Sequence, residues 1–140
     1  MPHTCETRFR VRYAETDQMS VVYYANYLVW MEVGRTDFCK MLGFNYKEME
    51  RDGAFLVVTE ASCRYLAPAR YDDAIVVETR LDRLNRRFVT FGYSIRNADT
   101  GNILAEGSTV HVAVGLDQKP KSVPQPYFDM LTKAARQAGE

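Results

Sequence analysis

Apolar and polar residues alternate over the first stretch that can be assigned, residues 8–13. Phe9, Val11 and Tyr13 fall on one face, and arginines fall on the other. A period of two is typical of a β-strand with one buried and one solvated face. We therefore expect the chain to begin with a strand at these positions.

Residues 21–42 follow a helical spacing instead. Ser20, a residue type that caps helices well, stands just before this segment, and Gly43 is placed to end it. The first half is apolar nearly all round, which predicts a helix that is buried rather than laid on a surface. Residues 46–51 predict one further helical turn.

Strand patterns return after the helix and continue almost to the end of the chain. They cover residues 55–67, 74–84, 88–96 and 103–116. Alternation within the first of them puts these side chains on one face: Phe55, Val57, Thr59, Ala61, Cys63 and Tyr65. In the last, Val110, Val112 and Val114 face one way, and we take the opposite face, with Thr109, His111 and Ala113, as the polar one. A weak amphipathic helix is expected at 127–138.

This order of elements predicts a fold of the α+β class. Antiparallel neighbours are the economical arrangement for strands joined by short turns. The apolar face of such a sheet must be covered, and the central helix is the large apolar segment available. We expect a curved antiparallel sheet wrapped around one long helix, with its other face and its edges favouring pairing with a second copy.

Composition and charge narrow the class of protein. The chain has 140 residues, 46% hydrophobic and 26% charged, which predicts one ordinary globular domain over residues 1–140. Lys and Arg total 18 and balance 18 Asp and Glu, which argues against a protein that binds mainly by neutralising nucleic-acid phosphates. We expect no nucleic-acid partner.

The cysteines and the N-terminus indicate a compartment. Cys5, Cys39 and Cys63 are widely spaced and form no CxxC, so we expect reduced thiols rather than a disulfide or zinc site. The first residues lack an apolar signal segment, and no stretch reaches the roughly 18 apolar residues of a membrane helix. A cytoplasmic protein without a membrane partner is expected.

Candidate chemistry gathers in front of the helix. Asp17 lies in a loop three residues before Ser20, where free backbone N–H groups and the positive end of the helix dipole are expected. A carboxylate beside aimed N–H donors is the minimum set for hydrolysing an ester or thioester. The alternative is that Asp17 merely stabilises the helix terminus, which is the commoner role of such acids.

The string YAETDQMSVVYYANYLVWMEVGR, residues 13–35, favours a catalytic over a structural role for Asp17. It resembles the signature of hotdog-fold acyl-CoA thioesterases of the 4-hydroxybenzoyl-CoA thioesterase type, and the likeness continues through residues 64–73, 86–88 and 115–124. In the signature it is carried by Tyr13, Thr16, Asp17, Val21, Val22, Tyr23, Asn26, Tyr27, Trp30 and Arg35. The resemblance implies the hotdog fold, a long helix wrapped by an antiparallel sheet, and a homodimer or homotetramer built edge to edge.

The resemblance also implies an activity and its residues. Asp17 would be the catalytic carboxylate, either as nucleophile or as general base on water, and both roles stay open. The backbone N–H of Tyr24, expected on the first helical turn, would stabilise the oxyanion. The implied substrate-binding residues are Val22, Asn26, Thr59, Arg86 and Arg87, with Lys119 and Lys121 as further candidates for the coenzyme phosphates. The expected reaction converts a short-chain or aromatic acyl-CoA and water into a carboxylic acid and free CoA.

Two departures from the family pattern leave acyl specificity open. Met19-Ser20 stands where many members have a glycine pair or Ala-Gly, and Tyr24 stands where many have His. The alternatives to an acyl-CoA thioesterase are a thioesterase acting on acyl carrier protein and a non-catalytic acyl-CoA-binding or regulatory module. No cofactor or metal is implied, because no ligand cluster is present.

The remaining candidates are assigned other roles. Glu32, beside Arg35, is expected to be ion-paired or hydrogen-bonded, and Glu60 to line a pocket or an interface. His3 falls in a terminus that we expect to fray. His111 is expected to be a satisfied histidine at the surface or at an interface, because no nucleophile is paired with it.

Overall fold

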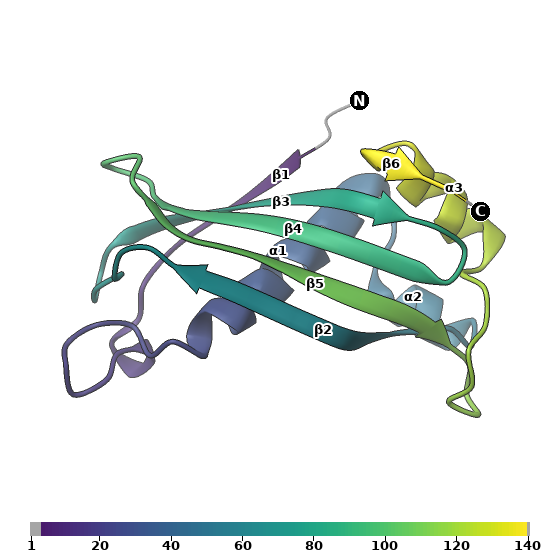
Figure 1. The fold of residues 1–140 in the computed structure, drawn as a ribbon, viewed down its shortest axis with the longest axis horizontal. Coiled ribbons are helices and arrows are strands. Elements are labelled where there is room, and N and C mark those ends of the chain that lie inside the picture. Colours follow the sequence, from purple (N-terminus) through teal and green to yellow (C-terminus); the bar gives the residue numbers. More distant parts are fainter. Residues whose placement is uncertain (1–3, 140) are drawn as a thin grey trace.

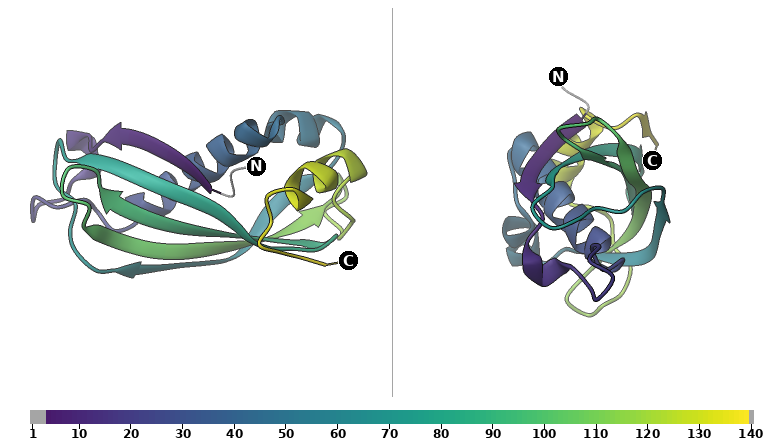
Figure 2. Two further views of the ribbon diagram at one scale, coloured as in Figure 1. Left: turned by 90° about the horizontal axis from the view of Figure 1, so that it is seen from above. Right: turned by 90° about the vertical axis from the view of Figure 1, so that its left-hand side faces the viewer.

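One curved antiparallel sheet dominates the computed structural model, which describes residues 4–139 (Figure 1). Its strands lie in the order β1-β3-β4-β5-β2, and a short β6 runs parallel to β3. The bounds are β1 Thr4–Arg10, β2 Phe55–Tyr65, β3 Ala74–Leu84, β4 Phe88–Asn97, β5 Ile103–Val114 and β6 Gln137–Ala138. The sheet curves around helix α1 (Asn26–Leu42), which the two views of Figure 2 show from the side and from one end. The expected α+β architecture, a sheet wrapped around a long helix, is confirmed.

The strand order differs from simple pairing of consecutive strands. Strands β3, β4 and β5 do form an antiparallel meander. Strand β2, however, lies beside β5, and β1 takes the edge of β3 that a β2–β3 hairpin would have used. The expectation of neighbouring consecutive strands is therefore wrong for β2, which becomes an edge strand.

Helix boundaries depart from the sequence pattern at the N-terminal side. Helix α1 begins at Asn26, not at residue 21, because Ser20 has a left-handed backbone (φ 66) and residues 21–25 form a bridge and a turn. Gly43 ends the helix as expected, with a left-handed φ of 110. Helix α2 (Tyr46–Arg51) is also confirmed.

The two ends of the chain are shifted as well. Helix α3 (Gln125–Thr132) begins earlier and ends sooner than the expected segment 127–138. The first strand lies at Thr4–Arg10 rather than at residues 8–13, and Tyr13 begins a short 3-10 turn.

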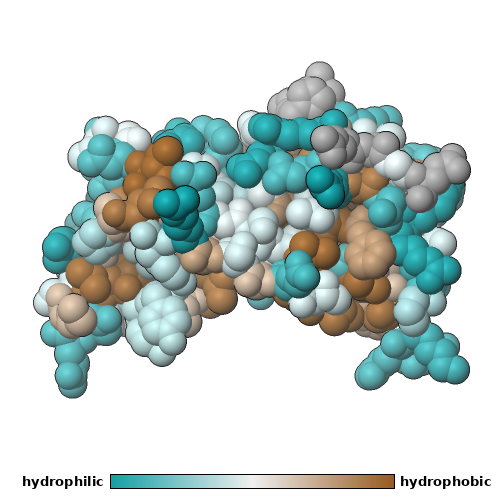
Figure 3. Space-filling model, viewed as in Figure 1, coloured by the Kyte–Doolittle hydropathy of each residue, from teal (hydrophilic) through white to brown (hydrophobic). Residues whose placement is uncertain are grey.

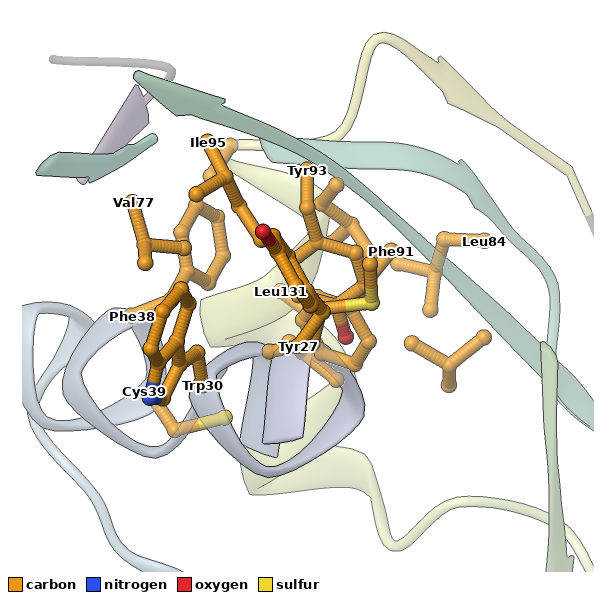
Figure 4. Close-up of a cluster of buried hydrophobic side chains, with 14 of the residues drawn as sticks. Tyr27, Trp30, Phe38, Cys39, Val77, Leu84, Phe91, Tyr93, Ile95 and Leu131 are labelled. Atoms are coloured by element: carbon orange, nitrogen blue, oxygen red, sulfur yellow. The ribbon is translucent and has the colours of Figure 1, made fainter. Parts of the chain in front are cut away.

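Helix α1 is buried on one side only. Trp30, Met31 and Phe38 are at most 2% exposed and pack into the concave face of the sheet, against side chains such as Phe91 and Ile95 (Figure 4). On the other side Val29 is 49% and Val33 41% exposed. The prediction of a helix buried all round is wrong, and an apolar strip of α1 is left uncovered within the single chain.

A β-bulge changes the faces of β2. Its pairing with β5 shifts register between Val58 and Glu60, so Thr59 is the extra residue. Because paired residues share a face, the bulge puts Val57 on the opposite side from Ala61. The expected common face from Phe55 to Tyr65 is therefore wrong, because one inserted residue exchanges the two faces of the strand beyond the bulge.

The faces of β5 are also inverted relative to expectation. Thr109 and His111 are 3% and 1% exposed and point into the core, whereas the valines of this strand lie on the outer face. The cause is the pairing with β4, where His111 lies opposite Val89 and Thr109 opposite Phe91, both fully buried. The expected surface position of His111 is wrong, because pairing with β4 determines which side chains of β5 face the core.

Gly34 brings α1 close to strand β3. A Cβ atom at Gly34 would lie 2.5 Å from Thr79 Oγ1 and 3.0 Å from Val77 Cγ1. We expect Gly34→Ala to lower the free energy of unfolding by about 1–3 kcal/mol through overpacking. Urea unfolding measures this effect, with Val33→Ala as the control at an exposed site on the same helix. A Gly34→Ala variant stabilised by about 1 kcal/mol, as helix propensity alone predicts, would contradict this packing.

Candidate active site

The loop that carries Asp17 is closed by backbone hydrogen bonds. The Asp17 N–H donates to Val21 O at 2.9 Å, and the Tyr23 N–H donates to Glu15 O at 2.9 Å. Between these bonds the chain turns tightly, with the Ser20 N–H donating to Asp17 O at 3.0 Å. Asp17 therefore stands at the base of a small hairpin-like loop and not on a free segment.

The Asp17 carboxylate is oriented by the same loop. Its Oδ1 accepts a hydrogen bond from the Met19 N–H at 2.8 Å. The residue is half-buried. This arrangement restricts the side chain without removing it fully from solvent, which is compatible with a role in proton transfer or nucleophilic attack.

Glu15 ties this loop to helix α1. Its carboxylate accepts hydrogen bonds from Trp30 Nε1 and from the Arg12 N–H, both at 2.8 Å, and the residue is 5% exposed. Burial raises the pKa of the Glu15 carboxyl, but the hydrogen bonds from Arg12 and Trp30 outweigh it, and the net pKa is lowered. The sequence analysis missed this residue, although an acid two positions before Asp17 and an indole on the helix were both visible.

Asn26 fastens the same loop from the first residue of α1. Its Nδ2 donates to Glu15 O at 2.9 Å. Asn26 thus contacts the backbone of the Asp17 loop. In this structure Asn26, which was expected to bind substrate, supports the loop.

Tyr24 lies in the turn that leads into α1, two residues before the helix begins. The expectation of a place on the first helical turn is therefore wrong, because α1 starts later than predicted. Its carbonyl accepts the Tyr65 hydroxyl at 3.0 Å, which fixes the turn to β2. Among the hydrogen bonds within residues 4–139, none has the Tyr24 N–H as donor. This N–H is available to a ligand.

A groove of about 310 Å³ lies beside this turn. Its lining includes Val22, Tyr24, Tyr27 and Tyr65 and ends at Pro68. The rings of Tyr27 and Tyr65 meet edge to face, with centroids 5.1 Å apart. Val22, an expected substrate-binding residue, therefore lies on the wall of an apolar groove that contains three tyrosines.

Other expected substrate contacts lie far from this loop. Thr59 is at the β2 bulge, where its Oγ1 donates to Val110 O at 3.2 Å. Arg86 and Arg87 are in the β3–β4 turn, at the opposite end of the sheet from the purple Asp17 loop in Figure 1. Arg86 donates to Gln125 Oε1 at 2.8 Å and stacks on Phe128 at 4.7 Å. One chain does not bring these residues to Asp17.

Lys119 and Lys121 belong to the same distant end of the sheet. They follow β5, and Lys121 Nζ approaches Gly53 O at 3.5 Å. Gly53 directly precedes the segment that enters β2. The two lysines therefore lie apart from the Asp17 loop within one chain.

His111 belongs to a buried polar network instead of a catalytic pair. Its Nε2 lies 2.9 Å from Thr109 Oγ1, which lies 2.6 Å from the Tyr93 hydroxyl. Burial lowers the pKa of the imidazole to about 4, with the charge of Arg35 adding to the effect. The ring is therefore neutral at neutral pH. His3 lies outside the described residues.

The remaining candidates have structural surroundings. Glu32 forms the expected ion pair with Arg35, at 4.0 Å. Glu60 is exposed beside the β2 bulge. Burial raises the pKa of the thiols of Cys5, Cys39 and Cys63. Within residues 4–139 no cluster of His, Cys, Asp and Glu could hold a metal ion, and no helix is long and apolar enough to span a membrane.

Comparisons with known proteins identify the family to which the fold belongs. A family model described as the Thioesterase-like superfamily matches residues 11–134. The YneP protein of Bacillus subtilis is 42% identical over 112 residues, 80% of each chain. The acyl-CoA thioester hydrolase YbgC of Escherichia coli is 31% identical over 117 residues, 83% of this chain and 87% of that protein. The DHNA-CoA thioesterase of Staphylococcus aureus superposes with a TM-score of 0.85 at 33% identity, covering 94% and 87% of the two chains.

The hydrogen bonds of the Glu15 carboxylate to Arg12 and Trp30 lead to a prediction about stability. At pH 7 we expect Glu15→Gln to lower the free energy of unfolding by about 1–3 kcal/mol, because charged hydrogen bonds are replaced by neutral ones. Because the folded-state pKa lies below the ordinary value of 4.5, the stabilisation is present above pH 4.5 and lost as the pH falls through the lower value. The difference between wild type and variant should therefore narrow below pH 4.5.

Urea unfolding at pH 7 and at successively lower pH measures this difference. Glu50→Gln is the matched control, because the Glu50 side chain is exposed and makes no ion pair within residues 4–139. A Glu15→Gln variant as stable as wild type at pH 7, or a difference that does not depend on pH, would show that the carboxylate does not hold the loop.

Proposed function

This chain belongs to the Thioesterase-like superfamily, and we propose that it hydrolyses acyl-CoA thioesters with Asp17 as the catalytic carboxylate. The resemblance to hotdog acyl-CoA thioesterases is confirmed, and the chain is a thioester hydrolase. One observation carries the assignment of Asp17: a half-buried carboxylate held in a closed loop, directly before a turn with a free N–H at the start of α1. The products are a carboxylic acid and free CoA.

The Tyr24 N–H is the hydrogen-bond donor to the thioester oxygen in this mechanism. It points from the turn before α1, where the positive end of the helix dipole adds to its effect. Donated to the thioester oxygen, it stabilises the negative charge that develops when the carbonyl carbon is attacked. The side chains around it, among them Val22 and Tyr65, form an apolar wall that favours this interaction by excluding water.

Asp17 supplies the attack in one of two ways. As a nucleophile, its carboxylate oxygen bonds to the carbonyl carbon, the C–S bond breaks, and water then hydrolyses the mixed anhydride. As a general base, it takes a proton from water, which attacks the carbonyl carbon directly. In both routes the sulfur leaves as the thiolate of CoA and takes up a proton. The contact between Asp17 Oδ1 and the Met19 N–H is compatible with either route.

A second copy of the chain is the natural partner for the edge of β2. Within residues 4–139, β2 pairs with β5 on one side and with no strand on the other, and most of its side chains are exposed. The exposed residues Leu28 and Val29 of α1, which line a groove with Val58 and Ala61 of β2, add apolar area on that side. An unpaired strand of 11 residues next to these apolar side chains favours closure by two-fold pairing. We propose a homodimer joined at β2, or a homotetramer of two such dimers.

The outer face of the sheet is where two dimers could meet. Figure 3 shows brown, apolar areas on this face. Val57 and Phe88 lie on this face, because both pair with Val112 of β5, and they are 46% and 47% exposed. Exposed apolar side chains grouped on a sheet face are typical of interaction surfaces.

Pairing of β2 with its copy also brings the two ends of the molecule together. The Tyr65 end of β2 contacts the Tyr24 turn, whereas the Phe55 end lies near the β3–β4 turn, since Phe55 pairs with Val114 and Phe88 with Val112. In an antiparallel pair of β2 strands, each Tyr65 end lies beside the partner's Phe55 end. We therefore assign Arg86 and Arg87 to the coenzyme phosphates of the site on the other copy.

A cytoplasmic location is part of the same proposal. The thiols of Cys5, Cys39 and Cys63 are free, which fits a reducing compartment. The proposed reaction requires that its substrate, acyl-CoA, be present in this compartment.

Replacing Asp17 tests the catalytic assignment. In a thiol-release assay with acetyl- to palmitoyl-CoA and aromatic acyl-CoAs, we expect Asp17→Asn to lower kcat at least about 100- to 1000-fold. The matched control is Asp117→Asn, because Asp117 Oδ1 makes the same type of loop contact, with the Lys119 N–H at 3.0 Å. The control should keep wild-type kcat.

Two outcomes would contradict the assignment. Full activity of Asp17→Asn would remove Asp17 from the mechanism. Failure of the wild type to hydrolyse any thioester would favour a non-catalytic acyl-CoA-binding module instead.

Charges on the exposed apolar residues of α1 next to β2 test the assembly. We expect Leu28→Lys combined with Val29→Lys to convert the two- or four-chain wild type into single chains, because like charges would meet across the two-fold axis. Light scattering after size-exclusion chromatography measures the mass, and circular dichroism checks the fold. Ile103→Lys is the control, since Ile103 is 43% exposed and lies away from these residues. A double variant with wild-type mass would exclude this interface.

A further inference from the structure

A second groove runs between α1 and β2, where the sheet curves away from the helix. Its volume is about 250 Å³, and it is lined on the helix side by Leu28, Val29, Glu32 and Arg35 and on the sheet side by Val58 and Ala61. Leu28 lies one helical turn after Tyr24, so the groove begins next to the proposed oxyanion site. Most of its lining is apolar, and its charged groups are confined to the far part.

The charge of Arg35 lies at the far end of this groove. Its side chain is 12% exposed. The ion pair that the structure gives it is with Glu32, at a distance of 4.0 Å, and the Glu32 side chain is 68% exposed. An ion pair of this length with a solvated partner contributes little. The guanidinium is thus largely withdrawn from water, and its main counter-charge can turn away into solvent.

The buried groups around Arg35 are neutral at neutral pH. Burial lowers the pKa of His111 to about 4 and raises that of the Cys39 thiol to about 12. Burial also raises the pKa of the hydroxyls of Tyr46 and Tyr93. The charge of Arg35 contributes to the pKa shift of all four groups. Among these four side chains, none supplies the negative charge that a buried cation requires.

The floor of the groove is polar at the same point. Thr109, 3% exposed, lines it and is held by the Tyr93 hydroxyl and by His111. A hydroxyl and a guanidinium at one end of an otherwise apolar groove form a set of donors. The guanidinium fork matches the two oxygens of a carboxylate better than any other common group.

We propose that this groove holds the acyl chain of the substrate and that Arg35 binds a carboxylate at the far end of that chain. The inference rests on the proposed thioesterase function and names its substrate class, acyl-CoA thioesters of dicarboxylic acids. The apolar wall from Leu28 to Val58 contacts the methylene groups, and the charged end lies against Arg35 and Thr109.

Helix geometry sets the chain length. Arg35 is nine residues after Asn26, about 14 Å along the axis, and its side chain leans back toward the N-terminus. This span suits an acyl chain of about six to ten carbons between the Tyr24 turn and the guanidinium. The matched pair of substrates is therefore octanoyl-CoA and octanedioyl-CoA, which differ only at the far end.

The experiment compares kcat/KM for these two substrates in wild type, Arg35→Met and Arg35→Lys. We expect wild type to favour octanedioyl-CoA and Arg35→Met to lower the ratio of octanedioyl-CoA to octanoyl-CoA at least about tenfold, with Arg35→Lys in between. The ratio compares two substrates on one protein sample, so partial unfolding of a variant cancels. Glu32→Gln should raise the ratio, because it removes the carboxylate that competes for Arg35.

Three results would overturn the proposal. One is a ratio that Arg35→Met leaves unchanged. Another is an equal loss with both substrates, which would make Arg35 a support of the fold or of catalysis. The third is loss of the wild-type mass in Arg35→Met, which would assign its charge to a carboxylate of the second copy. Failure of the wild type to hydrolyse either substrate or any other acyl-CoA would instead contradict the proposed function itself.

Discussion

One helix has to cover the concave face of a five-stranded sheet, and it covers only part of it. Gly34 allows α1 to approach Thr79 of β3 closely, and the aromatic side of the helix fills the space beneath β3 and β4. The helix is thereby drawn toward one side of the sheet. Strand β2, on the other side, keeps most of its side chains exposed. The open side contains the groove between α1 and β2 and the unpaired edge of β2.

The proposed site uses this open side together with the start of the helix. Glu15 and Asn26 fasten the Asp17 loop to α1, so the carboxylate and the Tyr24 N–H are carried by one rigid unit. Arg86 and Arg87, which we propose to bind the coenzyme, belong to the opposite end of the sheet. The proposed two-fold pairing along β2 would account for this separation, because each copy would supply the end that the other lacks.

Local pattern was enough to predict much of the fold. The strand at residues 88–96, the position of Gly43 and the α2 turn all follow from short-range rules, and each is confirmed. The loop containing Asp17 was also found, since its family signature is contiguous. These features depend on residues that are close in sequence.

The features that were missed depend on contacts between distant residues. The phase of β5, and with it the burial of His111, is set by pairing with β4. The bulge at Thr59 inverts part of β2. The late start of α1 follows from the bridge between Thr16 and Val22 and from the left-handed Ser20. Glu15 was missed because its partner, Trp30, lies 15 residues away.

We propose that two chains complete each acyl-CoA site, with Asp17 from one and Arg86 and Arg87 from the other. Subunit complementation tests this division of the site. Asp17→Asn chains, and chains with both arginines replaced by Ala, are each expected to be weakly active alone, and the two are mixed under conditions that exchange subunits. Activity is expected to rise on mixing, because every mixed dimer contains one intact site. Activity that stays at the average of the two separate variants would contradict it, since the residues would then act within one chain.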